Sequence, residues 1–440
     1  MDFSKRVADL SKIWKQASFV FPYFDKISVD WDKEYLEYIK KVTDAKTETE
    51  FHLLLAEFIN LLGDGHTDYL FPKELSEKTG FLPFSLKYIG GIYYIDSIID
   101  EFEEHLFAKI ISINGVPFSE LLQKAFRYIY HVKDFSPDYA LHKILPFLLN
   151  SEGNVAKTTK GCFSFDLLSS KPESLKKSRF ASPEKYTDIS NGKLDIRIYK
   201  SDILYIKLDD FLYNGAAEEI RIALSEQKSL SGVILDLREN IGGMTTFGAK
   251  IAELFISGVF HACNKKTRTM TGVALASASQ IGRWSKETIE KEIASGLTTA
   301  EEIDESMRLL SNTFCNEYTD SYGTEDNAAL YSGPIILLTS RYTVSAAEDF
   351  VAMFKSNNRA TIIGTETSGT TGTPLLQSLL CGGRIRICSV GYKLLDETEF
   401  IGCGIKPDIY KEISPEDFEK GFDSVLNYCL NENHLYQKTL

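Results

Sequence analysis

The sequence has no run of eighteen or more apolar residues, so no segment has the composition of a membrane-spanning helix. Its first residues, MDFSKRVADLSKIWKQ, carry charges throughout and include no apolar central region. We therefore expect no signal peptide, although a chain from which a signal had been trimmed would show the same pattern. The seven cysteines are scattered, and none follows a Cys-x-x-Cys spacing. This odd, scattered set indicates reduced thiols, so we expect a cytoplasmic protein.

Basic residues are also outnumbered. The chain has 49 lysines and arginines against 62 aspartates and glutamates, which gives a net charge of −13. This balance argues against binding to nucleic acids or to anionic membranes, because both need basic surface. No HExxH motif, Cys/His cluster, EF-hand loop, P-loop or GxGxxG motif occurs. We expect no metal, no nucleotide and no other cofactor.

A strand followed by a helix is indicated at residues 333–373 of this 440-residue chain. Pro334 to Leu338 is a short apolar run bounded by turn residues, which is typical of a buried strand. Ala346 to Phe354 has apolar residues at helical spacing, and Ser345 lies between the two elements. Ser345 is either the N-cap of this helix, with Glu348 completing a capping box, or a nucleophile beside helix N–H groups that bind an oxyanion.

A second apolar strand, Val233 to Leu237, ends in Arg-Glu-Asn and a glycine pair. Glycines after a strand permit positive φ angles and turn backbone N–H groups toward a ligand. Gly242 and Gly243 are therefore candidate ligand-binding positions. We expect Arg238 and Asn240 to hold the loop in place, without touching a substrate.

Four motifs in this chain resemble those of the serine peptidases of the C-terminal processing and tricorn-core type. They are LGDGHT (62–67), LDLRENIGG (235–243), the strand–SAAE–helix at 345–348, and GCGIKPDI (402–409). LGDGHT resembles the segment that carries the histidine in the tricorn-like branch. The motifs occur in the family's order and span nearly the whole chain.

The resemblance implies an α/β fold with a helical N-terminal cap, a small second module, and a C-terminal catalytic core whose sheet contains parallel strands flanked by helices. The length fits two or three domains. We expect the cap at residues 1–72, a PDZ-like or other β-rich module at 73–150, and the core at 151–440. The segment Ile111 to Pro117 fits either a PDZ-like module or an ordinary hairpin with an Asn-Gly turn. Residues 264–330 are charged and helical, and we interpret them as an insertion that acts as a lid.

A serine hydroxyl needs a base before it becomes a good nucleophile. Members of this family use either a lysine in the glycine-rich segment after the nucleophile's helix or a histidine on the N-terminal cap. That segment here, Gly364 to Gly372, contains no lysine. The resemblance therefore implies Ser345 as the nucleophile and His66 as the base. The tricorn-like pattern has a serine directly before the histidine, where this chain has Gly65, so how the acid reaches the imidazole stays open.

The same resemblance implies an acid ahead of the GCGIKPDI motif and an oxyanion hole. Glu399 is the first candidate for the acid, and Glu397 is the alternative. If this stretch is only a solvated acidic hairpin, neither glutamate has a catalytic role. The oxyanion donors would be the N–H of Gly242 or Gly243 and the N–H of Ala346. A histidine base predicts that kcat/KM rises with pH near the ordinary histidine pKa of about 6.5.

The predicted reaction is hydrolysis of peptide bonds through an acyl-enzyme, with peptides or unfolded protein ends as substrates. Two alternatives stay open. One is a non-catalytic peptide- or ligand-binding protein on the same fold, as in the related retinoid-binding modules, and the presence of both Ser345 and His66 argues against it. The other is an esterase or another acyl hydrolase. The sequence leaves the oligomeric state open.

Overall fold

The computed structural model describes most of the chain, namely residues 2–172, 174–177, 180–200, 202–227, 229–268, 272–311, 313 and 315–431. The chain forms two compact units, each assembled from three separate segments. The first unit comprises Met1–Pro72, Asn264–Tyr318 and Gly372–Tyr392, and the second comprises Lys73–Cys263, Thr319–Thr371 and Lys393–Leu440. The division into a cap, a small module and a core at residues 72 and 150 remains a prediction.

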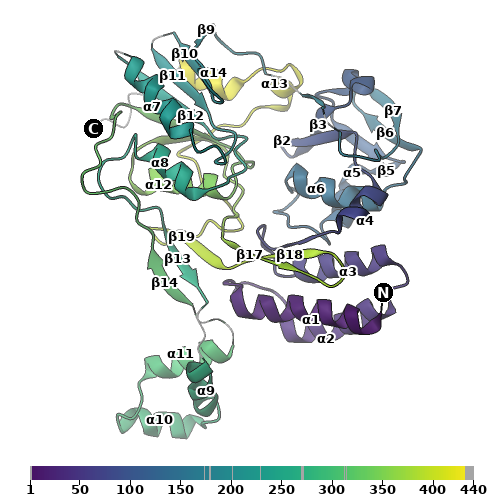
Figure 1. Ribbon diagram of the computed structural model, residues 1–440, viewed down its shortest axis with the longest axis vertical. Helices are drawn as coiled ribbons and strands as arrows, with labels where there is room; N and C mark the ends of the chain where they lie inside the picture. Colours follow the sequence, from purple (N-terminus) through teal and green to yellow (C-terminus); the bar gives the residue numbers. More distant parts are fainter. Residues whose placement is uncertain are drawn as a thin grey trace. The chain divides into compact units, whose positions relative to one another are not determined.

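The first unit begins with three helices whose apolar faces pack together. They are α1 (Phe3–Val20), α2 (Trp31–Asp44) and α3 (Glu48–Asn60) (Figure 1). Leu10 and Ile13 on α1 are fully buried. Trp31 on α2 stacks on Phe58 of α3, with the ring centroids 4.3 Å apart. The helices therefore form where their apolar spacing predicts them.

Strands from distant parts of the sequence complete the first unit. Over its described residues, one antiparallel sheet has the order β1-β18-β17, from β1 (Asp68–Leu70), β18 (Arg384–Cys388) and β17 (Pro374–Ser378). Another sheet has the order β14-β13-β19, from β14 (Asn316–Thr319), β13 (Cys263–Thr267) and β19 (Val390–Leu394). Strand β1 directly follows the turn that carries His66, so its pairing with β18 anchors that turn.

The predicted insertion at residues 264–330 contains three helices between β13 and β14 in the described part of the chain. They are α9 (Gly272–Ile281), α10 (Lys286–Ala294) and α11 (Ala300–Leu310). Thr299 and Glu302 form a capping box at the start of α11. Residues 269–271, 312 and 314 of this segment lie outside the described residues. The function of the segment as a lid remains a prediction.

A seven-stranded sheet, counted over the described residues, organises the second unit. Its strand order is β20-β16-β15-β12-β11-β10-β9, and the five strands from β20 to β11 run parallel, while β10 is antiparallel to both of its neighbours. The parallel pair β11–β12 confirms the pairing that the strand–helix–strand order predicts. The strands are β9 (Tyr186–Asp188), β10 (Asp195–Tyr199), β11 (Ile203–Lys207), β12 (Gly232–Asp236), β15 (Ile335–Thr339), β16 (Thr361–Gly364) and β20 (Ile409–Tyr410).

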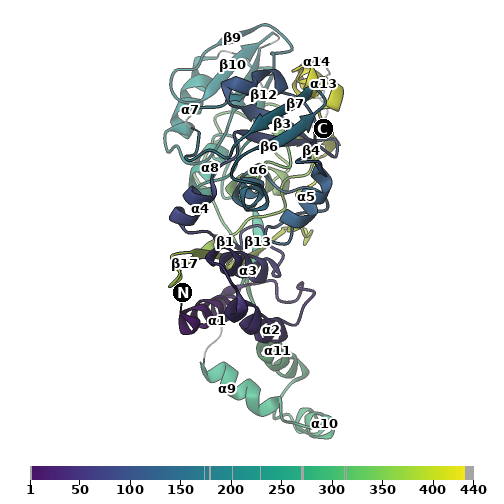
Figure 2. The same cartoon turned by 90° about the vertical axis from the view of Figure 1, so that its right-hand side faces the viewer.

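Helices cover both faces of this sheet, as the fold predicted from the sequence requires. On one face Tyr205, Ile234 and Leu338 share a buried cluster with Val425 and Cys429 of α14. Figures 1 and 2 show α7 and α14 on opposite sides of the sheet. All residues of β12 and β15 are buried, because both faces of these central strands are covered. The helices are α7 (Ala216–Glu226), α8 (Thr245–Ala252), α12 (Ala346–Ser356), α13 (Pro415–Glu419) and α14 (Ser424–Asn431).

The remaining elements of the second unit lie between residues 73 and 177. Asn114 and Gly115 have φ angles of 52° and 75° and connect β4 to β5, as the Asn-Gly hairpin interpretation predicts. The likeness of this region to a PDZ-like module remains a prediction. Its elements are α4 (Lys73–Thr79), β2 (Phe84–Ile89), β3 (Ile92–Ile98), the 3₁₀ helix η1 (Asp100–His105), β4 (Ile110–Ile113), β5 (Val116–Pro117), α5 (Phe118–Ala125), α6 (Asp138–Ile144), the 3₁₀ helix η2 (Leu145–Leu148), β6 (Asn154–Thr158), β7 (Gly161–Phe165) and β8 (Lys176–Lys177).

Over the part of the chain that the structure describes, no helix combines the length and the apolar character needed to cross a bilayer.

Candidate functional site

Ser345 lies at a sharp junction between a strand and a helix. β15 ends at Thr339, and α12 begins at Ala346 directly after Ser345. The φ of 61° and ψ of −127° at Ser345 lie in a region that residues with a Cβ rarely adopt. Strain of this kind costs about 1–3 kcal/mol and persists where the surrounding structure enforces it. Sharp strand-to-helix turns of this type present reactive serine side chains in other folds.

The capping box, one of the two interpretations of Ser345 and Glu348, is wrong. The Ser345 side chain makes no capping hydrogen bond to α12, and its backbone is outside the extended region that N-caps use. The Glu348 carboxyl instead reaches the segment after β16. Its Oε1 accepts hydrogen bonds from Thr367 Oγ1 at 2.5 Å and from the Gly369 N–H at 2.8 Å, and its Oε2 accepts one from the Thr370 N–H at 2.7 Å.

Glu348 has no exposed surface. Burial raises the pKa of its carboxyl to about 8, and the hydrogen bonds from Thr367, Thr370 and Gly369 oppose this shift. At neutral pH Glu348 is therefore mostly protonated. When the carboxyl is protonated, its O–H can donate a hydrogen bond to the Thr367 hydroxyl oxygen, which reverses the direction of that one bond, whereas the two backbone N–H groups only donate.

The next residue, Asp349, binds the same segment after β16 and also the start of α8. Its Oδ1 accepts a hydrogen bond from Thr371 Oγ1 at 2.8 Å, and its Oδ2 accepts one from Thr245 Oγ1, also at 2.8 Å. Thr245 is the first residue of α8, directly after the glycine loop. Glu348 and Asp349, on the first turn of α12, thus bind the loop after β16, and Asp349 also binds the first residue of α8, which follows the glycine loop.

The glycine loop after β12 packs directly against Ser345. Asn240 is fully buried, and its Oδ1 accepts a hydrogen bond from the Gly242 N–H at 2.9 Å. The Asn240 carbonyl oxygen accepts one from the Val344 N–H at 2.9 Å. A Cβ added to Gly242 would lie 2.7 Å from Ser345 Cβ and 2.8 Å from the Val344 carbonyl oxygen. Position 242 therefore excludes any side chain, and its φ of 90° favours glycine as well.

Two backbone N–H groups beside Ser345 make no hydrogen bond to other described residues of the protein. These are the N–H groups of Gly243 and Ala346. The N–H of Gly242, in contrast, is bound to the Asn240 side chain. The N–H of Ser345 donates to the Thr370 carbonyl oxygen at 3.0 Å. The loop thus leaves two donors, from two different segments, available near the Ser345 backbone.

His66 belongs to the first unit, on the turn between α3 and β1. Asp64 shapes this turn, because its Oδ2 accepts hydrogen bonds from the His66 N–H at 3.1 Å and from Thr67 Oγ1 at 2.7 Å. The Cys388 N–H donates to Thr67 Oγ1 at 3.0 Å and so ties the turn to β18. The backbone position of His66 is therefore fixed within its own unit.

The His66 imidazole is held in its neutral form. It is 8% exposed, and burial lowers its pKa to about 4. The nearby Arg386 guanidinium lowers the pKa further, while Asp68 raises it. Arg386 Nε also donates a hydrogen bond to Asp68 Oδ1 at 2.6 Å, so these two charges largely offset each other. The ordinary histidine pKa expected from the sequence does not apply at this position.

Glu397 and Glu399 lie in the second unit, between β19 and β20. Their carboxylate oxygens lie 3.7 Å and 3.6 Å from Lys393 Nζ. The side chains are 63% and 44% exposed. Both candidate acids are therefore solvated carboxylates that share one lysine as an ion-pair partner.

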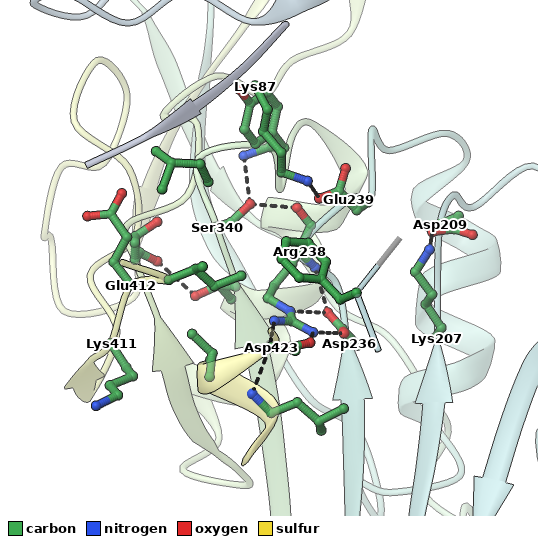
Figure 3. Close-up of a pocket in the computed structure, with 18 of the residues that line it drawn as sticks. Lys87, Lys207, Asp209, Asp236, Arg238, Glu239, Ser340, Lys411, Glu412 and Asp423 are labelled. Carbon is green, nitrogen blue, oxygen red and sulfur yellow. Dashed lines mark hydrogen bonds and ion pairs between the residues drawn. The ribbon is translucent and has the colours of Figure 1, made fainter. Parts of the chain in front are cut away.

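A charged cavity of about 720 Å³ opens at the carboxyl ends of β11, β12 and β15, a common position for ligand sites in parallel sheets (Figure 3). The Arg238 guanidinium at its wall donates to both oxygens of Asp236 and both oxygens of Asp423. Ser340 Oγ donates to the Arg238 carbonyl oxygen at 2.5 Å. The contacts of Arg238 and Asn240 agree with the expectation that they hold the loop, while the expectation that they do not touch a substrate remains a prediction. Ser345 is not among the described residues that line this cavity.

Strand β2 contacts the loop that precedes Ser345 and the loop after β12. The Tyr88 N–H donates to the Tyr342 hydroxyl at 2.6 Å, and Tyr342 lies three residues before Ser345. Lys87 forms an ion pair with Glu239, the neighbour of Asn240. Strand β2 therefore braces the loop after β12 and the loop that precedes Ser345.

Sequence reasoning missed the positions of Glu348 and Asp349 in this network. The available signal was a pair of adjacent acids on the first turn of a helix, followed by a segment rich in Thr and Gly at 365–373. Hydroxyl and glycine N–H donors of that kind are suited to satisfying buried carboxyl groups.

Comparisons with known proteins match this arrangement of elements. Residues 202–411 match the model of peptidase family S41, and residues 5–60 match that of the tricorn protease C1 domain. The carboxy-terminal-processing protease of Bartonella bacilliformis is 31% identical over 105 residues, which are 24% of this chain and 24% of that protein. The chain thus aligns with about a quarter of the length of this curated relative.

Similar folds occur among solved structures. Mature CPAF has a TM-score of 0.71 and 14% identity, and the match covers 97% of this chain and 96% of that chain. A structure from Parabacteroides merdae described as that of a peptidase has a TM-score of 0.56 and 17% identity, covering 96% of this chain and 95% of the other. Over residues 202–411, just under half of its length, the chain is similar to peptidase family S41.

Proposed function

We propose that this protein is a serine peptidase that cleaves peptide bonds through an acyl-enzyme, with Ser345 as the nucleophile. The observation that carries the proposal is the strained backbone of Ser345 at the strand–helix junction, next to two N–H groups without an acceptor among the described residues. An N-cap has no need of such a conformation, whereas a nucleophile does, because its side chain must project from the turn. The similarity of residues 202–411 to peptidase family S41 agrees with this chemistry.

The N–H groups of Gly243 and Ala346 are the proposed oxyanion hole. Neither donates to another described residue, so both can bind the negative oxygen of a tetrahedral intermediate. The Gly242 N–H is the weaker candidate, because Asn240 Oδ1 already occupies it. Gly242 instead acts by its lack of a side chain, which lets the loop approach Ser345.

His66 is the proposed base, and the segment 364–372, which would carry a lysine in the other branch of the family, has none. A neutral imidazole is needed to take the Ser345 proton and pass it to the leaving amine. Burial keeps His66 neutral over most of the pH range. Glu399 remains the proposed acid that orients the imidazole, with Glu397 as the alternative, and either carboxylate would have to leave Lys393 to do so.

The proposed substrates are peptides and unfolded protein ends. Extended chains of this kind can enter a site built from loops without the substrate having to unfold first. Ester hydrolysis by the same nucleophile follows the same steps, so the relative rates on matched peptides and esters decide between peptidase and general acyl hydrolase.

Replacing the nucleophile tests the proposal directly. We expect Ser345→Ala to abolish hydrolysis of an unstructured peptide while the circular dichroism spectrum and the melting temperature stay close to those of the wild type. The substitution removes the attacking oxygen, and it also permits the strained backbone to remain. A folded Ser345→Ala protein that still cleaves the peptide at a rate near wild type would contradict the assignment.

The base is tested by pH. We expect His66→Ala to lower kcat/KM by about 10²–10⁴-fold, the usual contribution of a positioned base. In the wild type the acid limb should lie near pH 4, and not near 6.5, because protonation of His66 at its lowered pKa removes the base. His261→Ala is the matched control and should leave the profile unchanged. A His66→Ala enzyme that keeps most of its rate would place the base elsewhere, and a wild-type limb at 6.5 would show that the pKa of the base is not lowered.

The close approach of the glycine loop is tested by adding one methyl group. Gly242→Ala places a Cβ 2.7 Å from Ser345 Cβ, so Ser345 or the loop must shift, and we expect kcat to fall by about 10²-fold or more. Gly91→Ala is the control, because Gly91 has a similar φ of 84° but no atom within 4 Å of the added Cβ. Equal activity losses in the two variants would show that backbone strain, and not the approach to Ser345, is responsible.

A further inference from the structure

Beyond the proposed nucleophile and base, one buried side chain is connected to the backbone of Ser345 through hydrogen bonds. The Ser345 N–H donates to the Thr370 carbonyl oxygen, and the Thr370 N–H donates to Glu348 Oε2. Glu348 lies on the first turn of α12, three residues after Ser345. Two consecutive hydrogen bonds, through Thr370, thus connect the Ser345 backbone to the Glu348 carboxyl.

The same carboxyl fixes two more points of the loop. Thr367 and Gly369 donate to Glu348 Oε1, and Thr367 Oγ1 in turn accepts a hydrogen bond from the Ile405 N–H at 2.7 Å. The Ser368 N–H donates to the Thr343 carbonyl oxygen at 3.0 Å, which links the loop to the segment just before Ser345. The loop at 367–370 therefore has little freedom to move while Glu348 is in place.

We infer that Glu348 is a positioning residue, which holds Thr370 so that its carbonyl oxygen keeps Ser345 in the strained conformation required for attack. A strained residue relaxes when its surroundings permit, and Thr370 is the contact that prevents the Ser345 peptide group from rotating. The inference rests on the proposed role of Ser345 and adds a residue that acts through it. Glu348 does not touch the substrate.

Glutamine cannot replace this glutamate. An amide oxygen at the Oε1 position leaves an NH₂ group facing the Thr370 N–H, and the reversed orientation leaves it facing the Gly369 N–H. One buried backbone donor is unpaired in either orientation. The loop should shift until that donor finds another acceptor, and the Thr370 carbonyl oxygen would move with it.

The chain contains a matched control. Glu219 is also buried on the first turn of a helix, and its carboxylate also accepts hydrogen bonds from two backbone N–H groups, those of Lys193 and Leu194, and from the Tyr213 hydroxyl. Glu219→Gln therefore removes the same kind of interaction at a position with no contact to Ser345 or its loops in the described structure. A general loss of stability would affect both variants alike.

The experiment compares Glu348→Gln, Glu219→Gln and Ser345→Ala with the wild type on an unstructured peptide and on a fluorophosphonate probe. We expect Glu348→Gln to lower kcat about 30-fold, or about 2 kcal/mol, with KM changed less than about twofold, and to slow acylation by the probe equally. Glu219→Gln should keep wild-type kcat. Wild-type kcat in folded Glu348→Gln, or equal losses in both glutamine variants, would overturn the inference, whereas activity of Ser345→Ala would overturn the nucleophile itself.

Two further measurements keep the inference testable if Glu348→Gln folds poorly. Thr367→Val removes one hydrogen-bond partner of the carboxyl at nearly constant volume, and kcat should fall less than in Glu348→Gln but with KM again unchanged. Because the pKa of Glu348 is raised from 4.5 to about 8, folding favours its protonated form, and the stability of the wild type relative to Glu348→Gln should decline as pH rises through this window. An unchanged kcat in Thr367→Val would contradict the inference.

Discussion

The backbone of Ser345 is held in a conformation that an isolated residue avoids, and the surrounding loops are arranged to hold it. Its N–H is bound by Thr370, its neighbour Val344 is bound by Asn240, and Gly242 lies against its Cβ. These contacts come from two loops, the one after β12 and the one after β16. Strain at one residue survives because several independent contacts would have to break before it could relax.

Parallel strands explain why these segments meet. β12, β15 and β16 are neighbours in the sheet, so the loops that follow them leave from the same edge. The loop after β12 carries Asn240 and Gly242, the loop after β15 carries Ser345, and the loop after β16 carries Thr370. The two acids on the first turn of α12 then bind across this edge. Hydroxyl and backbone N–H groups form the hydrogen bonds of both carboxyl groups, as buried polar groups require.

Much of this framework could be predicted from the sequence. The unbroken apolar runs at 233–237 and 334–338 predict central strands covered on both faces, and the structure confirms them as β12 and β15. The position of Ser345 between a strand and a helix followed from the same pattern. The glycine pair was recognised because positive φ after a strand is a strong local signal.

The sequence could not show where the Glu348 carboxyl points. Ser-x-x-Glu at a helix start has the same spacing whether the glutamate caps its own helix or crosses to a loop, and the outcome depends on how residues 364–372 fold. The lowered pKa of His66 could not be predicted from the sequence either, because it results from burial in the folded protein. The role of Glu397 or Glu399 as the catalytic acid remains a prediction, based on their position ahead of the GCGIKPDI motif. Their ion pairs are with Lys393, a close neighbour in the sequence, and do not test that role.

The central claim is that Ser345 attacks the substrate, and the site of covalent attachment tests it most directly. The folded wild-type protein would be treated with a fluorophosphonate probe, digested, and mapped by mass spectrometry. The account predicts one adduct on the peptide that contains Ser345, with fragment ions that place it on the Ser345 side chain. An adduct on another residue, or no adduct from a protein that hydrolyses peptides, would contradict it.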